Sequence, residues 1–339
     1  MTDPTSPPAP ANIPPDLPKN ELPKNERTPG AQRTVNLPID LPTERRNPRT
    51  AEIDTLPTLE VLRRINTEDE RVAKAVAEVL PQIAELADLA VAALRRGNRV
   101  HYFGAGTSGR LGFIDAAELP PTYGTPPEWV VAHHAGGTRA LSCAVEGVED
   151  DVALGASDAA GLRRGDVAIG IAASGTTPYV VGALRHAAEI GAATGLISAN
   201  PSSWFGREVD VHVPLDTGPE VISGSTRMKA GTATKMVLNA FSTTVMIRLG
   251  RTYSNLMVSV NALNSKLRRR LIRILVEATG LDARTCEHAL AEAGGDTRVA
   301  LVTLLADVPP ARAARALEDA GGAVREALLL LGDVRRDTA

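Results

Sequence analysis

The chain has 339 residues, of which 43% are hydrophobic and 3% aromatic, and its formal net charge is −3. This length predicts about two domains. Aromatic side chains are scarce and basic side chains are not in excess, which argues against nucleic-acid binding. Two cysteines and six histidines form neither a disulfide framework nor a metal-ligand pattern. No apolar run of about 18 residues predicts a membrane span and no signal peptide opens the chain. We therefore expect a soluble, cytoplasmic protein without a metal ion.

The beginning of the chain is rich in proline and poor in apolar runs. Residues 1–45 include Pro7-Pro8 and Pro14-Pro15, so we predict a disordered tail there. A longer amphipathic helix is predicted over 69–97. Before it, apolar residues recur at helical spacing, at Leu56, Leu59, Leu62 and Ile65.

Strand-like and helix-like segments alternate from residue 98 to 249. This alternation predicts a parallel sheet with helices on both faces, in which ligands bind at the carboxyl ends of the strands. The predicted strands are 98–103, 128–132, 166–172, 193–198 and 210–214. The predicted helices in this region are 108–117, 138–148, 178–190 and 231–249.

The remainder of the chain has only helical patterns. A basic helix is predicted over 255–278, and the charge run in it indicates a solvated face. Three short helices are predicted between Gly280 and Leu331, separated by Gly294-Gly295, Pro309-Pro310 and Gly321-Gly322. We therefore predict a catalytic domain with N-terminal helices over 46–279 and a small helical domain over 280–335.

A glycine-rich turn follows the first predicted strand. Gly104, Gly106 and Gly109 let the backbone turn sharply and approach a ligand, and Thr107 and Ser108 place hydroxyl groups at the start of a helix. Because backbone N–H groups at a helix start attract anions, the turn predicts a pocket for phosphate or another small anion. The alternative is a plain strand-to-helix turn that uses glycine and serine for geometry alone.

Two further hydroxyl-rich turns, at 174–177 and 223–226, also precede predicted helices. Neither has P-loop spacing, and the acidic residue that a dinucleotide site needs would be Glu128, at the start of a strand and not at its end. Serine and threonine donate to phosphate without a metal, so the turns favour a sugar phosphate, and Arg227 or Lys229 could assist. The predicted substrate-binding residues are Thr107, Ser108, Ser174, Gly175, Thr176, Thr177, Ser223, Ser225 and Thr226.

Two glutamates lie near these turns in the sequence. Glu118 precedes Pro120 and Pro121, which should stop its helix, and Glu149 closes the next helix-like unit. A solvated surface role is the ordinary alternative for a glutamate. In a straight helix Glu118 would lie about 15 Å from the helix start, so we expect either an early break or a pocket completed by another subunit.

Two adjacent histidines, His133 and His134, end a predicted strand. Neighbouring side chains on a strand point to opposite faces, so we do not expect them to bind a metal together.

Long blocks between Thr43 and Leu331 resemble the N-acetylmuramic acid 6-phosphate etherases, a family of sugar isomerase (SIS) domain enzymes. The matching blocks are TERRNPRTAEID (43–54), GAGTSGRLGFIDAAELPPTYG (104–124), EGVEDD (146–151), GIAASGTTPYV (170–180), SGSTRMKAGTATKMVLNAFST (223–243) and NLMVSV (255–260). The resemblance implies a SIS-type α/β sandwich, with a parallel five-stranded sheet flanked by helices and a small C-terminal all-helical domain. It also implies a homodimer, and Thr176 stands where the family commonly has an arginine.

The resemblance implies a carbon–oxygen lyase that acts in cell-wall sugar recycling. Such an enzyme cleaves the lactyl ether of N-acetylmuramic acid 6-phosphate by β-elimination and water addition, giving N-acetylglucosamine 6-phosphate and D-lactate. By resemblance, Glu149 is the base at C2, and Glu118 is the acid for lactate and then the base for water. This chemistry needs two acid/base groups and no metal or redox cofactor.

Two rival functions remain open from the sequence. One is a non-catalytic sugar-phosphate-binding regulator of the glucokinase-regulator type, which shares the SIS architecture but predicts two SIS domains in a longer chain. The other is a sugar-phosphate isomerase, which also uses a carboxylate at C2. Release of lactate separates the three functions.

Overall fold

The computed structural model describes residues 41–143, 145–259 and 265–332. Most of the predicted tail, residues 1–40, lies outside the described residues. The described chain begins with three 3₁₀ turns, Pro42–Glu44, Pro48–Thr50 and Ile53–Thr55.

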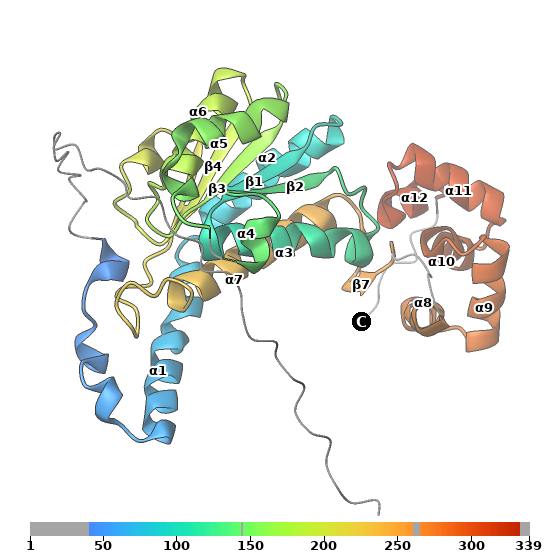
Figure 1. Ribbon diagram of the computed structural model, residues 1–339. Coiled ribbons are helices and arrows are strands. Elements are labelled where there is room, and N and C mark those ends of the chain that lie inside the picture. Colours follow the sequence, from blue (N-terminus) through green and yellow to red (C-terminus); the bar gives the residue numbers. More distant parts are fainter. Residues whose placement is uncertain (1–40, 144, 260–264, 333–339) are drawn as a thin grey trace, which may run out of the picture. The chain divides into compact units, whose positions relative to one another are not determined.

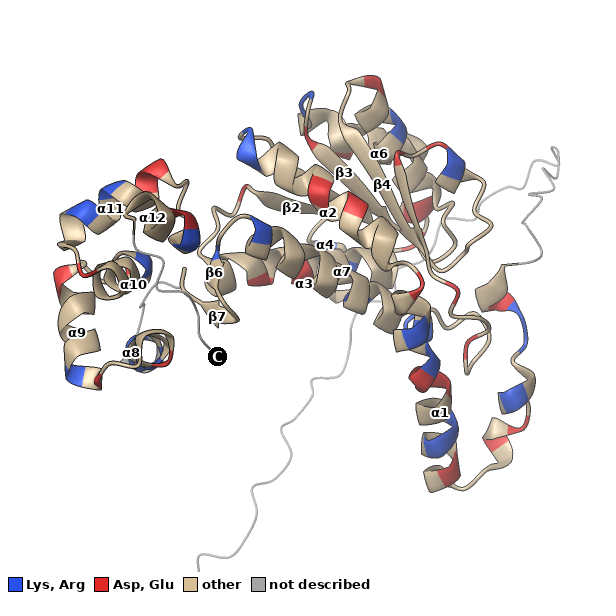
Figure 2. Ribbon diagram, turned by 180° about the vertical axis from the view of Figure 1, so that it is seen from behind, with Lys and Arg blue, Asp and Glu red and all other residues tan. Residues whose placement is uncertain are grey.

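Five parallel strands form the central sheet, as predicted from the alternating pattern. They are β1 (Val100–Gly104), β2 (Val130–His134), β3 (Val167–Ile171), β4 (Ala193–Ser198) and β5 (Val211–Pro214). Their order is β2-β1-β3-β4-β5. None of the five strands contains Lys, Arg, Asp or Glu, as expected of a sheet that is covered on both faces. Figure 2 shows this for the labelled strands β2, β3 and β4.

The order of the strands reverses between β1 and β3, because the chain moves outward from β1 to β2 and then returns to the other side. Gly104 and Ile171 are register partners at the carboxyl ends of these two strands. The turns that follow them therefore leave the sheet side by side. Such a reversal point is where open α/β sheets bind ligands.

Helices cover both faces of the sheet (Figure 1). One face packs against α1 (Thr58–Ala77), α2 (Leu80–Arg95), α3 (Gly106–Tyr123) and α7 (Lys229–Arg248). The other face packs against α5 (Val152–Asp158) and α6 (Pro178–Glu189). Neighbouring side chains of β1 point to opposite faces of the sheet. Tyr102 is buried in the apolar cluster on the first of these faces, and Phe103 is buried in the cluster on the other face.

The prediction that Pro120 and Pro121 stop the helix of Glu118 is wrong, because α3 continues through both prolines to Tyr123. A proline within a helix loses its own N–H bond, but its fixed φ is helical. Leu119 and Tyr123 are buried and attach the last turn to the core. The helix ends at Gly124, where φ is +59° and the N–H donates to the Pro120 carbonyl at 2.9 Å.

Two other helix predictions also differ from the structure. The helix predicted over 138–148 is reduced to α4 (Arg139–Ser142) and the 3₁₀ turn η4 (Val148–Asp150), because Gly147 has a φ of +78°. The helix predicted over 69–97 is divided between α1 and α2, since Pro81 lies in the first turn of α2. The apolar stripe before it does not join the core, as Leu59 and Leu62 are 58% and 56% exposed.

The C-terminal helices have an apolar cluster of their own, which extends from Val258 to Leu328. Between Gly280 and Leu331 the structure has four helices, not the three predicted, because three glycine or proline pairs divide a segment into four. The C-terminal elements are β6 (Thr252–Tyr253), β7 (Leu256–Met257), α8 (Ser265–Thr279), α9 (Ala283–Glu292), α10 (Thr297–Ala306), α11 (Pro310–Asp319) and α12 (Val324–Leu330). The boundaries at 45/46 and 279/280 stay predictions.

No helix within the described ranges is both long and apolar enough to cross a membrane.

Candidate active site

The first glycine-rich turn brings the start of α3 directly against β1. A Cβ added to Gly104 would lie 2.8 Å from the backbone of Gly109, and Gly106 has a φ of +53°. Glycine is therefore required at these positions for the helix to begin so close to the strand. Thr107 and Ser108 lie in the first turn of α3, half-buried, and their hydroxyl groups bond no other described residue.

The second turn, at the end of β3, is held in place by residues that follow β4. Asn200 Nδ2 donates to the Ser174 carbonyl at 2.9 Å, and Ser203 Oγ donates to the Gly175 carbonyl at 2.8 Å. Gly175 has a φ of +72°, and a Cβ there would lie 2.7 Å from Ser203. The Ser174 and Thr177 hydroxyls are 3.4 Å apart. The turn therefore presents a fixed pair of hydroxyl groups at the start of α6.

The third turn lies beside the first one at the start of α7. A Cβ added to Gly231, in the first turn of α7, would lie 3.7 Å from Thr107 Cγ2 and 3.2 Å from the Thr226 carbonyl oxygen, so the two turns meet at the start of this helix. Ser223 does not have a free hydroxyl group, because its Oγ donates to the Glu44 carbonyl at 2.7 Å. Ser225 and Thr226 are half-buried, and their side chains bond no other described residue.

A buried ionic cluster supports the third turn. Lys229 Nζ, which is fully buried, lies 2.7 Å from Glu68 Oε2 on α1. Asn47 Nδ2 donates to the same oxygen at 3.0 Å, and Arg49 bonds both carboxylate oxygens. Hydrogen bonding by Arg49, helped by Lys229, lowers the pKa of Glu68 to about 2. Lys229 is thus committed to Glu68 and positions the turn, so the suggestion that it assists phosphate directly is wrong.

The N-terminus of α7 is occupied by a carboxylate from the same chain. Glu220, fully buried, accepts from the Lys229 N–H at 3.0 Å and the Ala230 N–H at 2.9 Å. Burial raises the pKa of Glu220. The positive end of this helix is therefore satisfied by a carboxylate of the same chain. The groups that the third turn can present to a ligand are its hydroxyl groups and the exposed Arg227.

The two predicted catalytic glutamates are both exposed. Glu118 lies in α3, about 15 Å along the helix axis from Ser108. Glu149 lies in η4, which packs against α6. The structure thus brings the three turns together, but within one chain the unbroken α3 separates Glu118 from them.

Glu118 shares its exposed face of α3 with apolar side chains. Phe113 and Ile114 are 39% and 46% exposed, and Ala117 and Pro121 are exposed as well. Helical spacing places these residues on one side. An apolar surface around a carboxylate is typical of a face that another protein surface covers.

The histidines at the end of β2 point to opposite faces, as predicted. The ring of His133 stacks on Phe103, with centroids 4.5 Å apart, and bonds His101 at 3.0 Å. The ring nitrogens of His134 lie 2.7 Å from the Ala135 carbonyl oxygen and 3.1 Å from that of Gly106. His134 therefore supports the first turn through the Gly106 carbonyl, a role that no sequence signal indicated.

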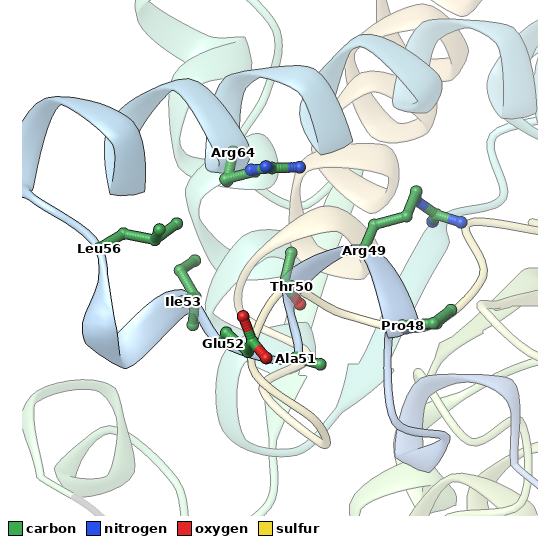
Figure 3. A pocket seen from close by; sticks show the side chains of 8 residues that line it. All are labelled: Pro48, Arg49, Thr50, Ala51, Glu52, Ile53, Leu56 and Arg64. Carbon is green, nitrogen blue, oxygen red and sulfur yellow. The ribbon is translucent and has the colours of Figure 1, made fainter.

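A pocket of about 330 Å³ lies between the N-terminal segment and α1 (Figure 3), and Thr50 on its wall donates to the Val221 carbonyl, two residues before the third turn, at 2.8 Å. It is lined by residues 48–53, Leu56 and Arg64. The Arg49 side chain on its wall is already paired with Glu68. Among the described residues, no group of three or more His, Cys, Asp or Glu is placed to hold a metal ion.

Comparison with known proteins gives two results. The family model described as the glucokinase regulatory protein N-terminal SIS domain matches residues 82–188. The chain is 60% identical over 267 residues to an N-acetylmuramic acid 6-phosphate etherase of Thermobifida fusca (strain YX), covering 79% of this chain and 88% of that protein.

Etherases of the same name from other bacteria are similarly related. The one from Pectobacterium atrosepticum is 50% identical over 291 residues, which cover 85% of this chain and 96% of that protein. The one from Mycolicibacterium smegmatis is 51% identical over 290 residues, which cover 85% and 97%. The similarity thus extends over nearly the whole length of these relatives.

Proposed function

This chain belongs to the N-acetylmuramic acid 6-phosphate etherase family, and from that premise we propose how its residues share the reaction. The chain cleaves the lactyl ether of N-acetylmuramic acid 6-phosphate by β-elimination and water addition, giving N-acetylglucosamine 6-phosphate and D-lactate. It is accordingly a carbon–oxygen lyase. In the proposal the three turns hold the sugar phosphate, and Glu149 and Glu118 move the protons.

The chemistry assigns a separate task to each carboxyl group. In the open-chain sugar the C2 proton is α to the C1 aldehyde, and the lactyl ether oxygen at C3 is β to it. Glu149 removes the C2 proton, and Glu118, in its acid form, protonates the departing lactate oxygen. The Glu118 carboxylate then takes a proton from the water that adds at C3, while Glu149 returns its proton to C2, so that both groups regain their starting protonation states. Two groups in opposite protonation states suffice for this sequence.

The convergence of the three turns at the reversal point between β1 and β3 carries the proposal. Thr107, Ser108, Thr176, Ser225 and Thr226 have hydroxyl groups that bond no other described residue, and Ser174 and Thr177 add a fixed pair. Such donors suit the oxygens of a phosphate dianion. Gly175 contributes its backbone through its positive φ, whereas Ser223 contributes by holding residues 44 and 45 against the turn.

The active enzyme in this proposal is a homodimer in which Glu118 serves the site of the partner subunit. The unbroken α3 keeps Glu118 about 15 Å from Ser108 of its own chain. Its exposed neighbours Phe113 and Ile114 form an apolar surface of the kind that a second subunit covers. Glu149 lies on a segment packed against α6, so it serves the turns of its own chain.

We place the activity in the cytoplasm, in the recycling of peptidoglycan amino sugars. A sugar phosphate is charged and does not cross a membrane unaided, so the enzyme and its substrate share a compartment. The regulator and isomerase functions have weaker support, because the etherases are related to this chain over 79–86% of its length at 48–60% identity.

The proposal is tested by incubating the protein with N-acetylmuramic acid 6-phosphate and assaying D-lactate. The wild type should release lactate. Glu118→Gln and Glu149→Gln should each reduce the rate of release by at least about 100-fold, which is the usual rate contribution of a general acid or base. Glu146→Gln changes an exposed neighbouring carboxylate and should keep the full rate. Near-normal rates in both Gln variants would overturn the assignment of the two glutamates, and absence of lactate from the wild type would overturn the activity.

A further inference from the structure

Arg110 follows the first glycine-rich turn, and its guanidinium faces main-chain carbonyls. Nη2 donates to the Ala140 carbonyl at 2.8 Å and is 3.4 Å from that of Cys143, and Nε donates to Leu141 at 3.1 Å. These carbonyls belong to the end of α4. The last carbonyls of a helix have no partner within it, and basic side chains commonly satisfy them.

The edge of the guanidinium that α4 occupies is one that a phosphate would need. Bidentate recognition of an oxyanion uses two parallel N–H groups, such as those of Nε and Nη2. In this chain both nitrogens already bond carbonyl oxygens. Arg110 therefore joins two segments of the chain and does not present this edge to the ligand.

The segment that Arg110 holds leads directly to Glu149. A Cβ added to Gly136 would lie 3.2 Å from Ala140 Cβ and 3.4 Å from both Val145 Cβ and Val148 Cγ2. The end of α4 and the start of η4 thus fold around the same glycine, and Val148 also packs against the buried cluster of α6. Glu149 is the next residue after Val148, so its backbone position depends on this packing.

We propose that Arg110 is a positioning residue for the etherase reaction, which fixes the Glu149 segment to the helix that carries Glu118. This inference rests on the proposed function, because the position of Glu149 affects the reaction only if Glu149 is the base at C2. Loss of the guanidinium frees α4 and lets Glu149 move relative to the bound sugar. The binding of the phosphate is expected to be unaffected, since the described hydrogen bonds of the turn hydroxyl groups involve no residue of α4.

The test compares Arg110→Met and Arg110→Lys with Arg139→Met. Arg139 is exposed on the same α4 helix and makes no side-chain bond to another described residue, so it controls for loss of charge. With N-acetylmuramic acid 6-phosphate as substrate, Arg110→Met should lower kcat about 10- to 100-fold, the cost of a small misplacement of a catalytic group. Arg110→Lys, which keeps one donor, should recover part of kcat, and Arg139→Met should match the wild type.

Binding separates positioning from phosphate recognition. The dissociation constant of N-acetylglucosamine 6-phosphate, measured by calorimetry, should change less than about threefold in both Arg110 variants, well under the tenfold that about 1.4 kcal/mol represents. A weakening of tenfold or more with kcat retained would overturn the proposal and make Arg110 a phosphate ligand. An unchanged kcat in both variants would overturn it as well.

Hydrogen exchange distinguishes failure of this inference from failure of the proposed function. In Arg110→Met, or in Arg110→Lys if the first variant does not fold, backbone amides of 139–143 and 145–151 should exchange faster, with those of α6 unchanged. Unchanged exchange in that segment contradicts the positioning role even if lactate is produced. If exchange rises but the wild type releases no lactate, the contact is real and the etherase assignment is at fault.

Discussion

Asp115 gives a quantitative test of how α3 is fixed to the core. Asp115 is 4% exposed, and its carboxyl group lies between β1 and α7. Tyr102 OH donates to Oδ2 and Ser242 Oγ donates to Oδ1, each at 3.0 Å. Asparagine at this position keeps both contacts, because it accepts from one hydroxyl and donates to the other. Asp115→Asn therefore removes the buried charge and little else.

The effect on stability follows from the pKa of this group. Burial raises the pKa of Asp115 from 3.8 to about 6, in spite of the two hydrogen bonds. An acid whose pKa is higher in the folded state binds its proton more tightly there, so its contribution is most favourable below about pH 4 and is lost as the pH rises to about 6. A rise in this pKa from 3.8 to about 6 corresponds to about 3 kcal/mol. The free energy of unfolding of Asp115→Asn, minus that of the wild type, should rise by up to about that amount between pH 4 and 7.

The assay is urea unfolding of both proteins at pH values from 4 to 8, followed by circular dichroism. Asp88→Asn, an exposed site on α2, is the matched control and should give a difference that is nearly independent of pH. A flat or falling difference for Asp115→Asn would refute the reasoning, since it would mean that the carboxyl group carries no cost of burial in the folded state.

Two further predictions concern the turns. Gly175→Ala forces a side chain onto a φ of +72° and against Ser203, so it should destabilise the fold by about 1–3 kcal/mol and weaken binding of N-acetylglucosamine 6-phosphate in calorimetry. Gly97→Ala, with a φ of +79° and open space, should leave binding intact, and equal binding in both variants contradicts the close packing of the turn. Lys229→Met removes the buried ammonium group from Glu68, which keeps its bonds to Arg49 and Asn47. The loss in urea unfolding should therefore be clear but below the cost of a buried charge left with no partner, which is about 3–5 kcal/mol. The exposed Lys74→Met on α1 should cost almost nothing, and an equally small loss for Lys229→Met would show that the ion pair is not a stabilising contact.

Local sequence patterns were sufficient for the sheet and for the turns. The strands and the helices α6 and α7 lie within about two residues of their predicted bounds, because each has an apolar period and a glycine or proline boundary of its own. The predictions failed where tertiary packing overrides such signals. The prolines of α3 were expected to end it, but the burial of Leu119 and Tyr123 carries the helix through them.

The contacts that organise the site were beyond sequence reasoning because they join distant segments. Glu68 and Lys229 are 161 residues apart in the chain, and neither has a local pattern that differs from a surface charge. The same holds for Arg110, which lies next to the first glycine-rich turn in the sequence but whose donors face α4. Side-chain direction, which residue spacing alone does not determine, decides these roles.

Mixing two inactive variants tests the central claim most directly, namely that each active site combines Glu149 of one chain with Glu118 of its partner. Glu118→Gln and Glu149→Gln, each inactive alone, are unfolded, mixed in equal amounts and refolded, and D-lactate release is measured. Random pairing makes half of the dimers mixed, each with one intact site, so the account predicts about one quarter of the wild-type rate. A mixture no more active than the separate variants would contradict it, because both glutamates would then serve a site within a single chain.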